Sequence, residues 1–141
     1  MDTDWVAIIV ESLILAVIIF GAMFTEHWNY RRIQKKQENS DRNKILLLIK
    51  EDLTRKMRFI NESTKYKDYK PFLTDVWDSV IISGKQTLLQ FDTIKNLEHT
   101  YCWMKYYNTE LQQKGTINEQ TLIDLLGEIK KTTESSLAIL R

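Results

Sequence analysis

The sequence predicts an all-α protein: one N-terminal transmembrane helix that continues into a basic stalk, followed by a small antiparallel helical bundle. Residues 5–24 are predominantly apolar and contain Glu11 as their only charged residue, and as a helix they would span about 30 Å, the thickness of the hydrocarbon core of a bilayer. Beyond this segment, apolar residues recur at steps of three and four, as on one face of a helix. One proline and four glycines in 141 residues argue against a turn-rich β fold.

Charge is distributed unevenly along the chain and predicts its orientation. Residues 1–30 contain four acidic residues and no Lys or Arg, whereas residues 31–70 contain thirteen basic residues against six acidic ones. The positive-inside rule places the basic side in the cytoplasm and the N-terminus outside. We therefore expect a single-pass protein of the cell membrane, with these parts: a short extracytoplasmic tail (1–4), a transmembrane helix (5–24), a basic juxtamembrane stalk (25–44) and a cytoplasmic helical bundle (45–141).

Aromatic and basic residues flank the apolar segment. Trp5 stands at its outer edge and Trp28 beyond its inner edge, as in the aromatic belts of membrane proteins. Four basic residues follow on the inner side: Arg31, Arg32, Lys35 and Lys36. These interface anchors have two interpretations, because they either only fix the orientation of the helix or also attract anionic lipid headgroups.

Glu11 is the exceptional residue of the apolar segment. A carboxylate in hydrocarbon costs a few kcal/mol or more unless it has a partner, water or a proton. One interpretation is that Glu11 reaches outward or is tolerated. The other is that it faces a second transmembrane helix, since Ser12 and Ala16 form a small-xxx-small pair that allows close approach of another backbone. A proton or ion pathway is the least favoured interpretation.

The stalk is predicted to continue into the first helix of the bundle, over roughly residues 42–63. Its apolar face consists of Leu46, Ile49, Leu53, Met57 and Ile60, widened by Leu47, Leu48 and Phe59. A loop over residues 64–71 follows, and Pro71 is expected in the first turn of the next helix. This short amphipathic helix contains Trp77, and Gly84 is expected to close it in the left-handed conformation.

Two longer helices complete the predicted bundle. One runs from about Lys85 to Lys114, with a possible kink at residues 90–92 where Asp92 would cap an internal restart, and ends at Gly115. Its apolar positions are Leu88, Phe91, Ile94, Leu97, Tyr101, Met104 and Leu111. The next helix begins with a capping box formed by Thr116 and Glu119. Its apolar face contains Leu122, Leu126, Ile129, Thr133, Leu137 and Leu140.

Aromatic residues in the third helix make it the best candidate for a protein-contact surface. Tyr101, Trp103, Tyr106 and Tyr107 cover more than one helical face, so some of them must point outward. Trp77, in the preceding helix, is interpreted mainly as a core anchor. It is also one of the candidates for contact with another protein. Aromatic side chains are enriched at interfaces because they bury a large area at a small entropic cost.

Motifs for catalysis are not recognised in the sequence. His99 and Cys102 share a helical face, but zinc and copper sites need three or four ligands and no second cluster appears. A single cysteine excludes an internal disulfide framework. We expect no enzyme activity, no cofactor, no metal, no nucleic-acid partner and no small-molecule substrate.

Residues 45–110 resemble a loose family of uncharacterised membrane-anchored helical proteins of bacteria and archaea. The similar features are Leu46-Leu47-Leu48 with Glu51, Trp77-Asp78-Ser79 through Ser83-Gly84, Leu88-Leu89, and Tyr101 through Asn108. The chain departs from that pattern at Arg55-Lys56, where the family often carries an Asn. The resemblance implies a helical domain and no activity.

Three functions are compatible with these features. The first is a non-enzymatic scaffold or accessory subunit of a membrane protein complex, with an integral-membrane partner or a second copy of the chain in the bilayer. The second is a membrane-anchored regulatory protein that relays a signal through the stalk helix. The third, ranked last, is a metal-dependent enzyme that uses His99 and Cys102.

Overall fold

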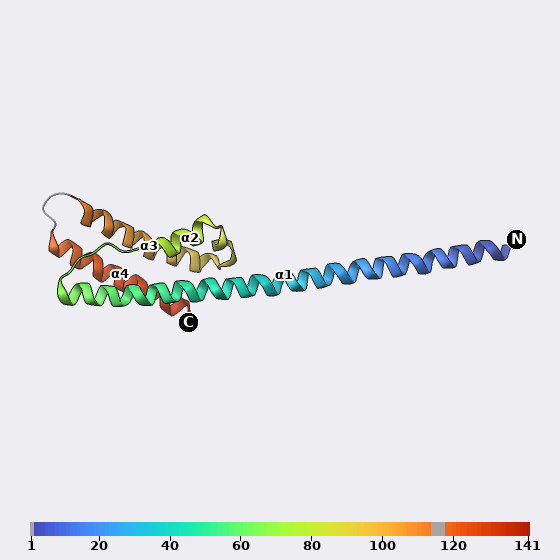
Figure 1. Cartoon of the computed structure of the whole chain (residues 1–141), viewed down its shortest axis with the longest axis horizontal. Coiled ribbons are helices and arrows are strands. Elements are labelled where there is room, and N and C mark those ends of the chain that lie inside the picture. Colours follow the sequence, from blue (N-terminus) through green and yellow to red (C-terminus); the bar gives the residue numbers. More distant parts are fainter. Residues whose placement is uncertain (1, 114–117) are drawn as a thin grey trace. The chain divides into compact units, whose positions relative to one another are not determined.

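The computed structural model describes residues 2–113 and 118–141 and is all-α, as predicted (Figure 1). The elements are α1 (Asp2–Tyr66), α2 (Asp75–Ile82), the short 3₁₀ helix η1 (Lys85–Leu88), α3 (Phe91–Gln112) and α4 (Glu119–Ile139). The described residues include no strand. The chain divides into two compact units, residues 1–40 and 41–141.

The first unit consists of the N-terminal part of α1. Its large apolar side chains are exposed, as Ile9, Leu13 and Phe20 illustrate with 56, 60 and 72 % of their surface accessible. This part of α1 is long and apolar enough to cross a membrane. Residues 25–40 are also helical, because no glycine or proline interrupts them.

Within the second unit, α1 buries one apolar face. Ile45, Ile49, Leu53 and Ile60 are buried, whereas Leu47 and Leu48 are exposed and do not widen the face as predicted. Successive residues are about 100° apart around a helix, so Leu47 lies on the side of α1 opposite Ile45 and Leu48 lies at the edge of the buried stripe. The helix ends at Tyr66, and Lys67 adopts a left-handed φ of 53°, which is typical of the residue after a helix.

Pro71 does not begin a helix, so that prediction is wrong. The chain from residue 68 to residue 74 is non-helical, and α2 starts only at Asp75. Asn108 of α3 accounts for this, because its Oδ1 accepts a hydrogen bond from the Phe72 amide at 2.6 Å and its Nδ2 donates to the Phe72 carbonyl at 2.8 Å. Phe72 is buried with its ring edge-on to Phe59 and Tyr107.

Gly84 adopts the predicted left-handed conformation, with φ 72°, directly after α2 and its C-cap residue Ser83. The predicted helix over 85–114 is divided at Leu89 and Gln90, whose backbones are extended, into η1 and α3. Gln90 is the N-cap of α3, and Asp92 lies in the first turn instead of capping. Phe91, predicted on the apolar face, is 75 % exposed.

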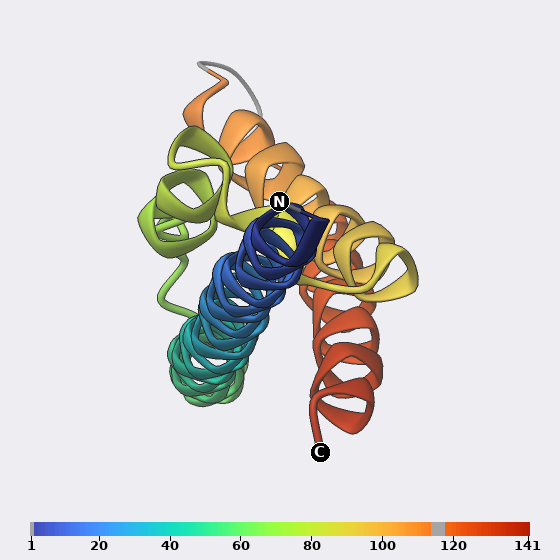
Figure 2. The same cartoon turned by 90° about the vertical axis from the view of Figure 1, so that its right-hand side faces the viewer.

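α4 packs antiparallel to α3 (Figures 1 and 2). Small polar residues line part of their contact: Thr100 Oγ1 lies 2.8 Å from Ser136 Oγ, and both residues are buried. Gly115 and Thr116 lie outside the described residues. The N-cap of α4 is Asn118, whose Oδ1 accepts a hydrogen bond from the Gln120 amide at 3.1 Å. Leu122, Leu126, Ile129 and Thr133 are buried as predicted.

Candidate functional site

Glu11 and Ser12 are exposed on α1, and Ala16, one turn beyond Ser12, is half-buried. The Ser12 hydroxyl donates to the Ile8 carbonyl at 2.7 Å, so its hydrogen-bonding need is met within its own helix. Glu11 is therefore the side chain in the apolar segment that most requires a group from outside the helix. Ser12 and Ala16 remain small enough for a second backbone to approach.

The predicted interface anchors are all exposed on α1. Trp5 and Trp28 have 69 and 61 % of their surface accessible. The four basic residues Arg31, Arg32, Lys35 and Lys36 are exposed as well. None of these four cations forms an ion pair with a residue that the structure describes.

The structure sorts the five aromatic contact candidates into two groups. Trp77, Tyr101 and Tyr107 are at most 2 % exposed and belong to the core of the second unit. Trp103 is half-buried and Tyr106 is 50 % exposed. Only Trp103 and Tyr106 are therefore accessible for contact with another molecule.

An aromatic surface, defined here as His99, Cys102, Trp103 and Tyr106, forms a shallow hollow on α3. The Trp103 ring lies edge-on to His99 and to Tyr106, with centroid separations of 6.2 and 6.0 Å. Trp103 Nε1 donates to His99 Nε2 at 3.1 Å. Its indole is thus held in place before any partner arrives.

The geometry does not assemble a metal centre around His99 and Cys102. His99 Nε2 is occupied by Trp103, and Cys102 Sγ lies 3.9 Å from Glu98 Oε1. Within residues 2–113 and 118–141, no three or more His, Cys, Asp or Glu side chains are grouped to hold a metal ion.

A buried polar cluster that sequence reasoning missed joins α1 to α3. The Tyr101 hydroxyl donates to Asp52 Oδ2 at 2.6 Å, and Lys56 Nζ donates to Asp52 Oδ1 at 3.1 Å. We call Asp52, Lys56 and Tyr101 the clasp. The sequence spacing could have revealed this pair. Asp52 lies three residues after Ile49 and Lys56 three after Leu53, which places both on the buried face of α1.

Trp77 of α2 connects a third helix to the clasp. Its ring stacks on Tyr101 with centroids 5.6 Å apart and planes inclined by 5°. Burial, together with the hydrogen bond to Asp52, raises the pKa of Tyr101 far above its ordinary value, so the phenol stays neutral. Asp52 accepts a hydrogen bond from both partners, so the clasp ties α1 to α3.

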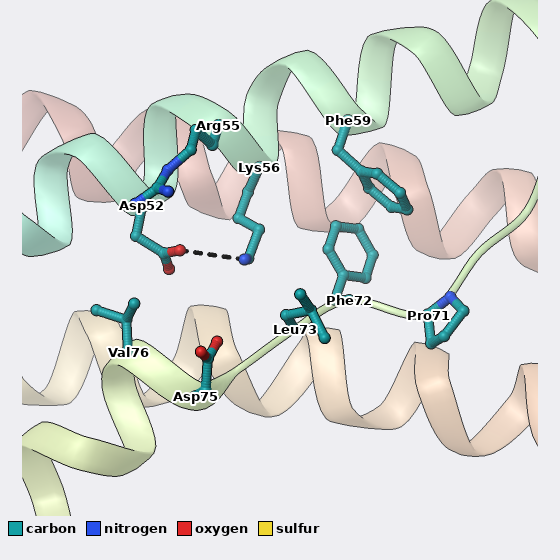
Figure 3. A pocket seen from close by; sticks show the side chains of 9 residues that line it. All are labelled: Asp52, Arg55, Lys56, Phe59, Pro71, Phe72, Leu73, Asp75 and Val76. Atoms are coloured by element: carbon teal, nitrogen blue, oxygen red, sulfur yellow. Dashed lines mark hydrogen bonds and ion pairs between the residues drawn. The ribbon is translucent and has the colours of Figure 1, made fainter.

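A pocket of about 350 Å³ opens beside the clasp (Figure 3). Lys56 and Asp75 point into it from opposite walls, and the rings of Phe59 and Phe72 lie next to them. Its lining residues are Asp52, Arg55, Lys56, Phe59, Pro71, Phe72, Leu73, Asp75 and Val76. The two carboxylates and two cations balance, so the pocket attracts neither cations nor anions by net charge.

A second ion pair joins α2 to α3 at the surface. Lys105 Nζ lies 2.7 Å from Asp78 Oδ1, and Asp78 Oδ2 also accepts from Thr74 Oγ1. The hydrogen bond with Lys105 lowers the pKa of Asp78, and the same hydrogen bond raises the pKa of Lys105. Solvent screens this exposed pair, so it contributes little to stability.

Tyr101 and Tyr107 provide a matched test of the clasp. We expect Tyr101→Phe to destabilise the chain by about 1.5–3 kcal/mol, the usual loss for a hydrogen bond to a charged group. Tyr107→Phe should remain within about 1 kcal/mol of wild type, because the buried Tyr107 hydroxyl has no hydrogen-bond partner among the described residues. Urea denaturation of the full chain in detergent measures both, and equal losses would contradict the tie.

The same pair of variants predicts a pH dependence. Burial raises the pKa of Tyr107 to about 12, and the pKa of Tyr101 is also raised. A raised folded-state pKa means that the stabilisation is complete below the unfolded pKa of about 10 and is lost as the pH rises above it. Each Tyr→Phe variant should therefore show a shallower loss of stability in alkaline solution than wild type.

Comparison with protein-family models, with curated proteins and with solved structures found no match. The resemblance of residues 45–110 to membrane-anchored helical proteins therefore stays a prediction.

Proposed function

We propose that this chain is a non-enzymatic single-pass membrane protein that serves as a scaffold or accessory subunit of a membrane protein complex. Its N-terminus would lie outside the cell membrane and its helical bundle in the cytoplasm. The partner in the bilayer would be another integral-membrane protein or a second copy of the chain.

Glu11 is the observation that carries this proposal. It is exposed about 9 Å from the Trp5 end of a predominantly apolar helical segment, where a carboxylate is costly unless another group meets it. Ser12 and Ala16 beside it are small and leave room for a second helix. A simple anchor gains nothing from such a residue, whereas a helix that must recognise a partner does.

The aromatic surface supports a second contact outside the bilayer. Trp103 is held by His99 and faces Tyr106, and an ordered tryptophan beside a tyrosine is typical of the residues that dominate binding energy at protein interfaces. The clasp, in contrast, is internally satisfied. Binding therefore accounts for the exposed features of this chain better than catalysis does.

Replacing Glu11 with leucine tests the proposal. Insertion should be unchanged or improved, because a charge is removed from hydrocarbon. Association with the membrane partner, measured by quantitative co-purification in mild detergent and by native mass spectrometry, should fall at least about tenfold if the contact is worth about 1.4 kcal/mol. Glu11→Gln should keep part of the association, because an amide still forms interhelical hydrogen bonds.

Val17→Ala, on the opposite side of the same helical segment from Glu11, Ser12 and Ala16, is the control and should leave association unchanged. Native mass spectrometry also separates a homo-oligomer from a complex with a different protein. If Glu11→Leu and wild type associate equally, the contact at Glu11 does not exist. If wild type is monomeric and co-purifies with nothing, the scaffold proposal fails.

One observation favours a second candidate function, a regulatory protein that relays a signal. α1 is helical without a break from Asp2 to Tyr66, so one element contains both Glu11 and Asp52. A relay requires Glu11→Leu to alter amide hydrogen exchange in residues 41–141, and Gln34→Pro, which breaks the helix between them, to abolish that response. Unchanged amide hydrogen exchange in Glu11→Leu would exclude the relay and leave the scaffold as the only proposed function.

A further inference from the structure

We infer that one side of α1 beyond the apolar segment is a binding face for anionic phospholipid headgroups. Its residues are Trp28, Arg31, Arg32, Lys35 and Lys36, and we call them the headgroup face. The inference rests on the proposed insertion of residues 5–24 in a bilayer, and it does not depend on which way the helix is oriented.

Helical geometry brings the four cations together. Arg31 and Lys35 are four residues apart and form one row along the helix, and Arg32 and Lys36 form the neighbouring row. Trp28 precedes Arg31 by three residues and Arg32 by four, so its indole lies on the same side. All five side chains are exposed.

The position along the helix matches the headgroup layer. Trp28 is about 6 Å and Arg31 about 10 Å beyond Phe24 by helical rise, while each headgroup region is about 5–7 Å thick. An indole prefers this layer, and the long Arg and Lys side chains extend along the helix to reach it. Lys35 and Lys36 follow one turn later, still within about one Debye length of the charged surface.

The charges are arranged at a cost to the isolated helix. Two like-charged pairs at four-residue spacing destabilise a helix by a few tenths of a kcal/mol each. No described carboxylate forms an ion pair with any of the four cations. Further along α1, in contrast, Lys56 is paired with Asp52 at the same spacing. The unpaired cluster next to the apolar segment is thus complementary to the phosphates of anionic lipids.

Anchoring of orientation alone does not require this arrangement, because the positive-inside rule depends on the number of cations near the segment and not on a shared side. A membrane surface rich in anionic lipid attracts each nearby Lys or Arg with a free energy of about 1 kcal/mol. Four cations on one side, with an indole in the headgroup layer, therefore select anionic over zwitterionic lipid around this helix.

The test uses the full chain reconstituted into vesicles of equal amounts of phosphatidylglycerol and phosphatidylcholine. Native mass spectrometry after gentle extraction counts the lipids of each kind that remain bound. We expect wild type to retain phosphatidylglycerol over phosphatidylcholine by about tenfold or more, given the attraction per cation. The ratio should fall severalfold in Arg31→Gln/Arg32→Gln and approach one when Lys35→Gln and Lys36→Gln are added.

A matched control removes the same charge elsewhere: Lys50→Gln, Arg58→Gln, Lys130→Gln and Lys131→Gln, all at exposed positions of the second unit. It should keep the wild-type ratio. Both leaflets have the same composition, so an inverted helix does not change the readout. A ratio that is equal in wild type and the fourfold variant, or that falls equally in the control, overturns the inference.

Alkaline carbonate extraction of the same vesicles separates this inference from the proposed function. Protein that remains in the vesicles but shows no lipid preference overturns only the headgroup face. Protein that is released from them was never inserted, which overturns the membrane-spanning segment on which the proposed function depends.

Discussion

Replacing Trp77 with alanine is expected to destabilise the helical bundle by about 3–5 kcal/mol, the usual cost of removing a buried aromatic side chain. Trp77 is 2 % exposed and stacks on Tyr101. Its loss creates a cavity and also removes the ring that holds Tyr101 in position for Asp52. Because a small domain is stable by only about 5–15 kcal/mol, this is a large fraction of the total.

Trp103→Ala is the matched control for this prediction. Trp103 is half-buried at the edge of the core, so its removal should cost less than that of Trp77, about 1–2 kcal/mol. Urea denaturation of both full-length variants in mild detergent, followed by circular dichroism, measures the difference. Comparable losses would show that Trp77 is not the anchor of the core. Trp103→Ala should instead weaken association with a soluble partner.

Replacing Asp52 with alanine is expected to cost about 3–5 kcal/mol, as is typical when one member of a buried ion pair is removed. Lys56 is 8 % exposed and would lose its partner, while the Tyr101 hydroxyl would lose its acceptor. The loss of stability comes mainly from leaving these buried groups without a partner. It therefore exceeds the net stabilisation that the contacts provide in the wild type.

A combined variant separates the two sources of that penalty. Asp52→Leu, Lys56→Met and Tyr101→Phe together replace the clasp with apolar groups of similar size and should recover stability to within about 1–2 kcal/mol of wild type. The same denaturation experiment applies. A triple variant as unstable as Asp52→Ala would mean that the clasp stabilises the bundle by its own interactions.

The clasp shows why part of the site escaped prediction from sequence. Asp52 and Lys56 occupy the buried face of α1, but helical periodicity counts apolar residues and passes over polar ones. Tyr101, the third member, is 49 residues from Asp52 in the sequence. The only local signal was an oppositely charged pair at four-residue spacing, which is common on solvated helices.

At Pro71 and Phe91, tertiary structure overrides the conformation that the local sequence predicts. Proline favours the first turn of a helix, yet the backbone after Pro71 stays non-helical because Asn108 bonds both polar groups of Phe72. Phe91 fits the apolar period of the helix, yet the extended backbone at Leu89 and Gln90 starts α3 afresh, and Phe91 faces solvent.

The all-α class, the membrane-length apolar segment, the buried stripes of α1 and α4 and the left-handed Gly84 follow from sequence, because each depends on the periodicity of neighbouring residues or on the conformation of one residue. Tertiary structure was needed to separate the buried Trp77, Tyr101 and Tyr107 from the accessible Trp103 and Tyr106. It was also needed to join Asp52 to Tyr101, because such contacts connect residues far apart in the chain.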